Sequence, residues 1–502
     1  MTSNSVDALV DPAGAGQEGL GGRLSRLAAL FPSRVALVDE HRVWTYADTE
    51  LAANQFARAL ASRGVRPSSW VGIMLKNRGE FMLSALAAWK LGAVPVPFSW
   101  RLPPQELEAT LALASLELLI VEADAERAPR ALPLSELLAE ARSLDVAPPP
   151  DRINRPWKIA MSGGSTGRPK LIIADTTAPT APSVRAIYRM RPSGTALIAS
   201  PLYFNGPFVY ATLQLIAGGT VVIRPRFDPV DFLRSLNDHK VNWTFAVPTM
   251  LNRVMALEPA LRAAVDLTPL EVVMHSAAPM PTWLKRQVID WLGPERVLEF
   301  YGATEVRATT IWGDEWLTRP GSVGRPLPGH RIEIRDDAGV KLPAGSIGEI
   351  WIAPPGGPAY SYRGAEARIE DGYCSVGDLG WLDEDGYLYI ADRRADLIIT
   401  GGINVYPAEV EAAILEHPSV VDACVIGLPD REYGQIVHAI VELKSNALPD
   451  SPLLLAHCRQ RLATFKLPRS FEFIPALPRE VTGKLRRSAL RDDRVMNRDQ
   501  AS

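Results

Sequence analysis

The sequence predicts an α/β protein with a large N-terminal domain and a small C-terminal domain. At 502 residues the chain is too long for a single hydrophobic core. Short apolar runs alternate with amphipathic segments along most of its length, which predicts βαβ units and parallel sheets. A charged break at Asp392–Asp396 then precedes a new periodic segment, which indicates a domain boundary. We therefore expect a mobile tail over residues 1–20, an N-terminal domain over 21–392, a hinge over 393–396 and a C-terminal domain over 397–502.

The composition is that of an ordinary globular enzyme. Hydrophobic residues make up 47% of the chain, charged residues 22%, and the formal net charge is −3, so no basic field indicates a nucleic-acid partner. The apolar runs are too short to span a membrane, and residues 1–20 lack the pattern of a secretory signal. Cys374, Cys424 and Cys458 have no metal-binding spacing, which suits a reducing compartment. We expect a cytoplasmic protein without a membrane span.

The first βαβ unit follows from helix and strand signals. Thr45–Asp48 opens an amphipathic helix that Gly64 ends. Val71–Leu75 reads as a buried strand, Phe81–Leu91 as a second helix, and Ala93–Phe98 as a second strand. These residues are expected to form core.

The same alternation continues after residue 190. The segments with the strand pattern are Ala196–Ser200, Val241–Pro248, Glu271–Pro279 and Val297–Phe300. Further along, residues 321–350 read as a small antiparallel unit, and Trp381–Ile390 reads as a hairpin with a turn at Gly386. A helix of the C-terminal domain is expected from Ala408.

The stretch Trp157–Ala174 is the strongest functional signal. Two apolar runs flank Ser162–Pro169, so the pattern predicts two strands joined by a loop rich in glycine and hydroxyl residues. Such a loop can turn backbone N–H groups and hydroxyls to one side, which makes a cradle for phosphate. The loop lacks the Gly-Lys-Ser/Thr of the standard phosphate-binding loop, and no helix is expected after it.

Gly163–Gly167 also matches the G-x-S-x-G pattern of serine hydrolases. That pattern needs a helix directly after the serine, whereas Pro169 and an apolar strand run follow here. A serine hydrolase is therefore a remote alternative, and an ordinary hairpin loop is the structural alternative.

The sequence MSGGSTGRPK resembles the phosphate-loop signature of adenylate-forming enzymes, which include acyl-CoA synthetases, adenylation domains of peptide synthetases and luciferases. Three further stretches resemble the same family in the same order, and the resemblance runs from about residue 30 to about residue 490. It implies a large N-terminal domain that includes a distorted β-barrel, and a small α+β domain that acts as a mobile lid.

The resemblance also implies roles for individual residues. Around the nucleotide, Ser162, Gly163, Gly164, Ser165, Thr166, Gly167 and Lys170 are expected to cradle phosphate, and Ala277 and Ala278 to lie against the adenine. Tyr301 would stack on adenine beside Gly302, Thr304 would contact the α-phosphate, Glu305 would hold Mg²⁺, and Asp378 and Arg393 would bind the ribose. Gly401 and Gly402 would line the tunnel for the CoA arm, and Lys484 would be the catalytic lysine. His275 alone is expected to be a satisfied core histidine rather than a catalyst.

The stretch Pro201–Phe208 matches the position that lines the acyl pocket in this family. The alternative reading is a packed corner at a strand end. Peptide-synthetase domains have an aspartate here for the substrate's ammonium group, whereas this chain has neutral Asn205, which disfavours an amino acid. The aromatic edge made by Tyr203, Phe204 and Phe208 favours an apolar, bulky or long acid.

Two positions depart from the family pattern. The hinge residue, commonly Asp or Lys, corresponds to Ala395, and the glycine before the ribose-binding arginine corresponds to Asp392. These departures leave the identity of the hinge residue open.

The resemblance implies an ATP-dependent acyl-CoA ligase that uses ATP, Mg²⁺ and coenzyme A. Its partners would be a small carboxylic acid and CoA, with a carrier protein as the alternative acceptor, and the protein would be a monomer or homodimer. A catalytically silent relative is a further alternative, which the presence of Thr304, Glu305, Asp378, Arg393 and Lys484 disfavours.

Overall fold

Parallel strands form the centre of the N-terminal domain. The computed structural model of the chain describes residues 18–122, 130–163, 169–177, 187–479 and 485–500. Six neighbouring strands run parallel in the order β1 (Val35–Val38), β10 (Thr220–Ile223), β9 (Thr195–Ile198), β11 (Trp243–Ala246), β12 (Val272–His275) and β13 (Val297–Gly302), with β2 (Val43–Thr45) antiparallel at the edge. Most of their residues are buried, as expected for a sheet covered on both faces.

Beyond β13 the same sheet becomes antiparallel. The order continues through β14 (Arg307–Trp312), β15 (Ser322–Pro326), β22 (Leu388–Arg393), β21 (Asp378–Leu382), β17 (Gly348–Ala353), β20 (Tyr373–Ser375) and β19 (Arg368–Glu370), and β16 (Arg331–Arg335) also pairs with β17. This continuity matters for the site because it brings Asp378 and Arg393 into the same sheet as Tyr301.

Two smaller sheets complete the N-terminal domain. One is parallel and has the order β4 (Val94–Pro97), β3 (Trp70–Met74), β5 (Leu116–Val121) and β6 (Ala131–Pro133). The other is the antiparallel hairpin of β7 (Ile159–Gly163) and β8 (Pro169–Ala174), joined at the edge of β8 by β18 (Tyr360–Arg363).

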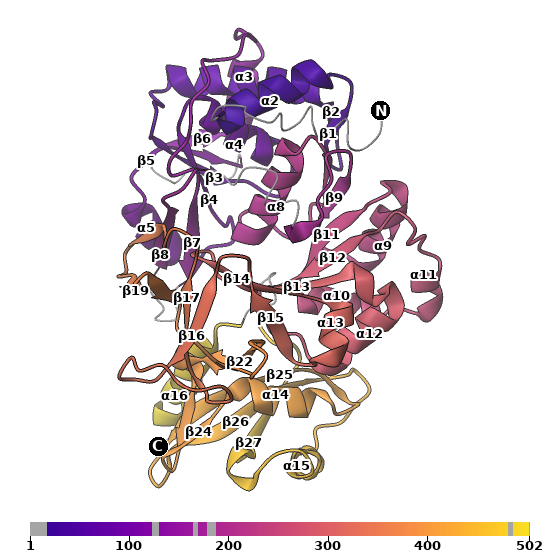
Figure 1. Cartoon of the computed structure of the whole chain (residues 1–502), viewed down its shortest axis with the longest axis vertical. Helices are drawn as coiled ribbons and strands as arrows, with labels where there is room; N and C mark the ends of the chain where they lie inside the picture. The colour runs from indigo at the N-terminus through magenta and orange to yellow at the C-terminus, as the bar shows by residue number, and fades with distance from the viewer. Residues whose placement is uncertain (1–17, 123–129, 164–168, 178–186, 480–484, 501–502) are drawn as a thin grey trace.

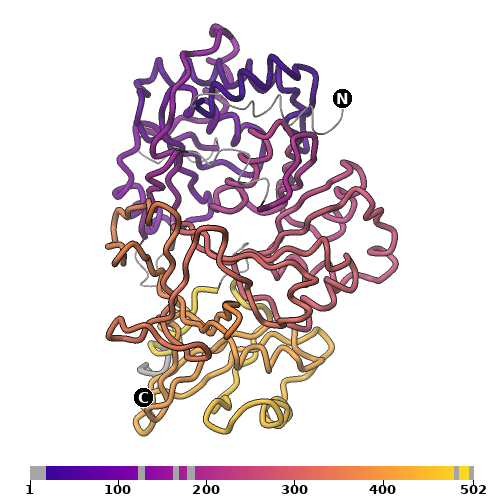
Figure 2. Tube along the Cα trace, viewed as in Figure 1, coloured from indigo at the N-terminus to yellow at the C-terminus, as the bar shows by residue number. Residues whose placement is uncertain are grey.

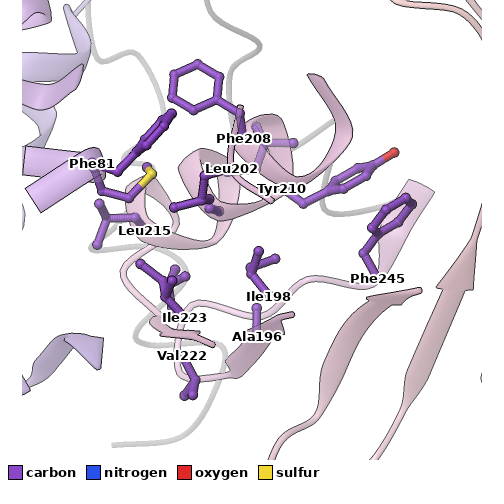
Figure 3. Packing of buried hydrophobic residues seen from close by; sticks show 14 of the residues in the cluster. Phe81, Ala196, Ile198, Leu202, Phe208, Tyr210, Leu215, Val222, Ile223 and Phe245 are labelled. Atoms are coloured by element: carbon purple, nitrogen blue, oxygen red, sulfur yellow. The ribbon is translucent and has the colours of Figure 1, made fainter. Parts of the chain in front are cut away.

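The helices cover the parallel strands. In helix α3 (Tyr46–Ser62) the Thr45 side chain accepts from the Asp48 N–H and the Asp48 carboxylate accepts from the Thr45 N–H, which is the reciprocal cap that the sequence signals. Figure 3 shows how α8 (Asn205–Ile216) enters the core: Phe208 meets Phe81 edge to face, and Tyr210 lies beside Phe245. The helices described in this domain are α2 (Leu20–Leu30), α3 (Tyr46–Ser62), α4 (Gly79–Lys90), α5 (Pro104–Leu113), α6 (Leu134–Ala141), α8 (Asn205–Ile216), α9 (Pro229–Asp238), α10 (Pro248–Met255), α11 (Pro259–Ala263), α12 (Thr282–Leu292), α13 (Gly313–Thr318) and the 3-10 turn η1 (Pro294–Arg296).

The C-terminal domain lies at one end of the molecule, opposite α2 and α3 (Figure 1). It has its own sheet and its own apolar core, which includes Val410, Val425 and Val437. The trace in Figure 2 shows this yellow and orange part of the chain below the strands of residues 300–390. Its elements are the 3-10 turn η2 (Arg394–Asp396), β23 (Ile398–Thr400), β24 (Ile403–Val405), α14 (Pro407–Leu415), β25 (Val420–Asp430), β26 (Gly434–Leu443), α15 (Ser451–Arg459), the 3-10 turn η3 (Thr464–Lys466), β27 (Ser470–Ile474) and α16 (Arg487–Gln500).

The mixed α/β fold with a large and a small domain is confirmed, while the barrel stays a prediction. Residues 1–17, most of the expected tail, lie outside the described residues, and α2 begins at Leu20. Among the described residues, no helix has both the length and the apolar character needed to cross a membrane.

Candidate active site

The predicted site residues follow the carboxyl ends of neighbouring parallel strands. Residues 199–208 follow β9, residues 276–279 follow β12, and residues 303–305 follow β13. Ligands of open α/β sheets bind at this edge, because the loops that leave adjacent strands meet there. Residues 301–305 are all partly exposed although the strand that leads to them is buried. The fold therefore presents this motif at an accessible edge of the sheet.

Tyr301, Asp378 and Arg393 meet at that edge. The Tyr301 hydroxyl donates to Asp378 Oδ2 at 2.8 Å, and Arg393 Nε lies 3.2 Å from Asp378 Oδ1. Asp378 is opposite Arg393 in the β21–β22 ladder, so pairing of these strands fixes the contact. Burial and the neighbouring Asp378 charge raise the pKa of Tyr301 well above its usual value, so the phenol stays neutral. A flat aromatic ring thus lies beside a carboxylate and a guanidinium, as the predicted adenine and ribose contacts require.

Glu305 is held by two side chains from another part of the fold. Its Oε1 accepts a hydrogen bond from the Tyr362 hydroxyl at 2.6 Å and lies 3.3 Å from Lys170 Nζ. Lys170 Nζ also lies 3.8 Å from the centre of the Tyr362 ring. Because β18 pairs with β8, Tyr362 and Lys170 both reach Glu305 from the sheet that carries the predicted phosphate loop. The Glu305 side chain is only 6% exposed, and its contacts with Tyr362 and Lys170 fix the position of the carboxylate.

This arrangement fits magnesium bound together with a nucleotide. Within the described part of the chain, no group of three or more His, Cys, Asp or Glu side chains could form an all-protein metal cage. Mg²⁺ in phosphate-transfer sites commonly takes one or two carboxylates and completes its coordination with phosphate and water. A single Glu305, oriented by Tyr362 and Lys170, is therefore a suitable protein ligand for such an ion.

The hairpin of β7 and β8 carries the predicted phosphate loop. Ser162 pairs with Lys170 and Gly163 with Pro169, so the flanks are two antiparallel strands, as predicted. Residues Gly164, Ser165, Thr166 and Gly167 lie outside the described residues. Since a strand begins at Pro169, the helix that a serine-hydrolase elbow requires is not present after the motif.

Gly302 allows a tight approach of two strands. A Cβ at this position would lie 2.8 Å from the Val306 carbonyl oxygen and 3.1 Å from the Arg307 Cα. The ladder between β13 and β14 also shifts its register between Tyr301 and Gly302. Any larger residue would therefore displace the turn that holds Thr304 and Glu305.

The segment after β12 contains a buried histidine and a strained alanine. His275 is fully buried, and burial lowers its pKa to about 4, so it is a neutral core residue as expected. The expectation that its hydrogen bonds are satisfied is wrong, because neither ring nitrogen has a partner among the described residues; Nε2 lies 3.8 Å from Glu299 Oε2. Ala277 is exposed and has φ of +75°, in the left-handed region that non-glycine residues rarely adopt.

Replacing Ala277 by glycine is expected to stabilise the protein. The substitution removes the steric cost of a Cβ at positive φ, and we expect a gain of about 1 kcal/mol in the free energy of unfolding. The thermal unfolding midpoint of the ligand-free protein measures it. Ala278→Gly is the matched control, because Ala278 has no positive φ and glycine there only adds chain entropy, so its midpoint should fall. A midpoint that is unchanged or lower in Ala277→Gly would contradict the strain argument.

The aromatic segment after β9 divides between the core and the accessible edge. Phe204, Asn205 and Gly206 are partly exposed, whereas Tyr203 and Phe208 are buried. The Tyr203 and Phe204 rings lie 4.5 Å apart. Phe208 packs between Phe81 and Trp89 in the core, so its ring supports this segment from behind. The structure also shows that α8 begins at Asn205, a helix start that the sequence analysis did not predict.

The segment predicted to be the hinge is linked to the last helix by ion pairs. Arg487 at the start of α16 pairs with Asp396 Oδ2 at 3.0 Å and with Glu411 Oε2 at 2.7 Å, and its Nη1 lies 3.8 Å from Asp392. Burial raises the pKa of Asp392 to about 6 although its carboxylate accepts from the N–H groups of Arg393 and Ala408. Asp392 is thus a buried structural carboxylate.

Ala395 stands in η2 and is exposed. A cavity of about 270 Å³ lies beside it, lined by Val376, Gly377, Arg393, Arg394 and Ala395. Because its side chain is a methyl group, Ala395 forms no ion pair in this 3-10 turn. The choice of hinge residue stays a prediction.

The chain around the predicted catalytic lysine contacts the N-terminal domain. Lys484 itself lies outside the described residues. Two residues further along, Arg486 forms a two-pronged ion pair with Glu106 of α5, with N–O distances of 2.9 and 3.0 Å. This contact joins the C-terminal domain to the N-terminal domain close to Lys484 in the sequence.

Gly401 and Gly402 form the tight turn between β23 and β24. Their φ values are +57° and +78°, and both residues are exposed. A Cβ at Gly402 would meet no atom within 4 Å, so the glycine is required by the backbone conformation and leaves open space beside it. Their predicted role beside the CoA arm stays a prediction.

Two residues that the sequence analysis did not select contact predicted site residues. Tyr362 holds Glu305, but it lies far along the chain, and no local pattern marks it. Lys158 is buried and contacts Asn205. Its signal was available: it is one of only ten lysines, and it stands inside an apolar run.

Family models match both domains of the chain. The model of the AMP-binding enzyme family matches residues 24–360, and the model of the AMP-binding enzyme C-terminal domain matches residues 409–484.

Full-length relatives support the same grouping. A fatty acid–[acyl-carrier-protein] ligase, ScoC, of Streptomyces coeruleorubidus is 32% identical over 92% of this chain and 93% of its own length. A feruloyl-CoA synthase of an Amycolatopsis species is 32% identical over 94% of this chain and 99% of its own length. The solved o-succinylbenzoate CoA synthetase of Bacillus subtilis, in complex with its acyl-adenylate intermediate, superimposes with a TM-score of 0.84 at 29% identity, covering 95% of this chain and 98% of that one. The chain belongs to the AMP-binding enzyme family, in the acyl-CoA synthetase branch of the adenylate-forming enzymes.

Proposed function

We propose that this protein is an ATP-dependent ligase that joins an apolar, bulky or long carboxylic acid to coenzyme A through an acyl-adenylate. The observation that carries the proposal is the meeting of two groups of side chains at one sheet edge. Tyr301, Asp378 and Arg393 suit a nucleoside, and Glu305 with Lys170 suits its phosphates. The two groups are joined by the short segment 301–305, which follows β13 directly.

In the first step, an oxygen of the substrate carboxylate attacks the α-phosphorus of ATP. The bond to the pyrophosphate oxygen breaks, and acyl-AMP and pyrophosphate form. Lys170 and the hydroxyl and N–H groups of the Ser162–Gly167 loop stabilise negative charge on the phosphates, and Lys484 does so on the reacting oxygens. Glu305 would hold magnesium together with the phosphates, where the metal would supply Lewis-acid neutralisation of their charge.

In the second step, the CoA sulfur attacks the acyl carbon, and AMP leaves. The thiol proton leaves to solvent, so the products are the thioester and AMP. The C-terminal domain rotates about residues 393–396, which moves Lys484 away and brings the turn at Gly401 and Gly402 to the acyl-adenylate. The Arg486–Glu106 ion pair would break in this rotation, because its two residues belong to different domains.

A carrier protein is the alternative acceptor. It is favoured by one observation, the full-length similarity to the fatty acid–[acyl-carrier-protein] ligase ScoC. The predicted acyl edge at Tyr203 and Phe204, which the core residue Phe208 supports from behind, is aromatic and uncharged and supports an apolar acid, while Lys158 beside Asn205 opposes a substrate ammonium. An amino acid is therefore a poor substrate for this site.

The decisive experiment is acid-dependent exchange of labelled pyrophosphate into ATP. A panel of fatty, aryl and short-chain acids is tested with the purified protein, and active acids are then offered CoA or a phosphopantetheinylated carrier protein. We expect exchange with apolar acids and thioester formation with CoA. Absence of exchange across the whole panel would refute adenylation, and thioester formation only on the carrier would transfer the assignment to the alternative.

Gly402→Leu is expected to reduce thioester formation while acyl-AMP still forms and accumulates. A leucine side chain would occupy the open space beside the turn, where the CoA arm is proposed to pass. Gly402→Ala is the matched control, because it carries the same backbone cost of a Cβ at positive φ without the bulk. Rates of pyrophosphate exchange and of thioester formation are compared in both variants. Equal loss of the two half-reactions in Gly402→Leu, or an unchanged response to CoA, would refute the tunnel assignment.

A further inference from the structure

The start of α8 combines a buried cation with the positive end of a helix. Lys158 is 5% exposed, and its Nζ donates to the side-chain oxygen of Asn205, the first residue of α8, at 2.6 Å. Within the described part of the chain, no carboxylate lies at ion-pair distance from this ammonium. An ammonium has three donors, and the contact with Asn205 uses one of them.

The first turn of α8 has unsatisfied donors of its own. The N-cap residue Phe204 provides no side-chain cap, and the first turn contains no acidic residue. The backbone N–H groups of Asn205 and Gly206 have no acceptor among the described residues, and Pro207 has no N–H. Unpaired N–H groups at a helix start carry partial positive charge, so this helix end attracts an anion. Placing a lysine there adds repulsion instead of relieving it.

The backbone holds Lys158 in this position. Trp157 and Ile159 on either side are buried, and the Lys158 carbonyl accepts from the N–H of Ala174. These contacts fix the backbone of Lys158 directly before β7. Burial lowers the pKa of Lys158 to about 8, and the nearby Glu305 charge partly opposes this shift. Lys158 is thus largely charged near neutral pH and lies close enough to the phosphate end of the site to feel Glu305.

A buried charge without a counter-charge lowers the stability of the folded protein, unless a bound ligand supplies the opposite charge. The Lys158 side chain is buried, but its hydrogen-bond partner Asn205 is partly exposed, as are the neighbouring residues Phe204 and Gly206. Gly206 has no side chain that would cover the free N–H groups. The partly exposed residues of the cluster thus belong to the accessible segment that follows β9.

We propose that Lys158, the Asn205 side chain and the free N–H groups at the start of α8 form a subsite for a second anionic oxygen group on the acid substrate. This group, a carboxylate or a sulfonate, is distinct from the carboxylate that becomes activated. The inference rests on the proposed function and refines its substrate class to an acid with an apolar body and a second negative group. Such a subsite would give the enzyme a preference for acids that carry two negative groups.

The test compares acids of equal length in pyrophosphate exchange. Hexanoate and octanoate are paired with hexanedioate and octanedioate, benzoate with benzene-1,4-dicarboxylate, and butanoate with 4-sulfobutanoate. We expect the wild-type protein to prefer the doubly charged member of at least one pair. Lys158→Met should lower the ratio of kcat/KM for that pair by about 10²-fold, because one partner of a buried charge pair is removed. The sulfonate arm decides which anion the subsite prefers.

Asn205→Asp is the matched variant, since it keeps the side-chain volume but supplies Lys158 with a carboxylate. It should lower the same ratio, because the subsite is then already neutralised and repels an anion. In the wild-type protein the preference for the doubly charged acid should be present below about pH 8 and decline above it, as Lys158 loses its proton. The ratio should lose this pH dependence in Lys158→Met.

Calorimetric titration of each acid pair into the nucleotide-free protein separates this inference from the proposed function. If no acid supports exchange but the doubly charged acid binds in a manner that depends on Lys158, adenylation fails and the subsite stands. Equal binding and activation of both members in every pair would overturn the subsite. An equal fall in kcat/KM for both members of every pair in folded Lys158→Met would also overturn the subsite. Lys158 would then interact with the carboxylate that reacts. If Lys158→Met does not fold, the ratio in Asn205→Asp decides.

Discussion

Lys484→Ala is expected to lose adenylation while keeping thioester formation. Removing one preplaced cation from the developing charge on the acyl-phosphate oxygens should slow adenylation by about 10²–10³-fold, equivalent to about 3–4 kcal/mol. The proposed rotation of the C-terminal domain assigns this lysine to one half-reaction. The variant supplied with synthetic acyl-AMP and CoA should therefore make thioester at close to the wild-type rate. Pyrophosphate exchange and thioester formation, measured separately, test the two halves.

Arg486→Ala provides the control for lid position. It removes the ion pair with Glu106 that joins the two domains, but it leaves Lys484 in the chain. Since the pair is partly exposed, its loss should slow adenylation far less than the loss of Lys484. Equal loss of both half-reactions in Lys484→Ala would make the residue structural. If adenylation by Lys484→Ala is unchanged, another cation stabilises the reacting oxygens, and Lys466 is the next residue to test.

Glu305→Gln is expected to reduce pyrophosphate exchange by about 10²-fold while leaving the fold intact. The substitution removes the charge that would hold magnesium but retains an oxygen that can accept from Tyr362. The contacts of this carboxylate in the described residues are with the polar groups of Tyr362 and Lys170. Exchange rates over a magnesium titration measure the effect, and the variant should need a higher magnesium concentration.

Tyr362→Phe separates the charge of Glu305 from its orientation. The phenylalanine keeps the ring beside Lys170 and removes only the hydroxyl that holds Glu305, so a fall of about tenfold is expected. A wild-type exchange rate and an unchanged magnesium requirement in Glu305→Gln would refute the assignment of Glu305. A larger effect from Tyr362→Phe than from Glu305→Gln would show that the hydroxyl acts on substrate directly.

Local signals predicted most of the elements because each depends on residues close in sequence. The reciprocal cap of Thr45 and Asp48 begins α3, and the positive φ of Gly386 makes the predicted turn between β21 and β22. Bounds were less accurate where a turn follows a strand. The strand expected over Glu271–Pro279 ends at His275, because the left-handed Ala277 interrupts the extended backbone.

The sequence by itself determined the family and the two-domain organisation, and it placed Tyr301, Glu305, Asp378 and Arg393 in motifs. Each of these depends on a short pattern with a local physical cause, such as a strand end or a glycine turn. The contacts among them were decided by the tertiary structure. Pairing of β18 with β8 brings Tyr362 to Glu305, and the antiparallel register of β21 and β22 sets Arg393 against Asp378.

The tertiary structure alone also decided the environments of Phe208, Asp392 and Lys158. Phe208 enters the core because α8 turns that face toward Phe81, and Asp392 is buried because Arg487 from the last helix covers it. Lys158, directly before β7, meets Asn205 at the start of α8, a contact between segments 47 positions apart in the sequence. The burial, charge state and contacts of these side chains depend on segments that are distant in the sequence. A local sequence pattern does not specify which distant segment packs against a residue.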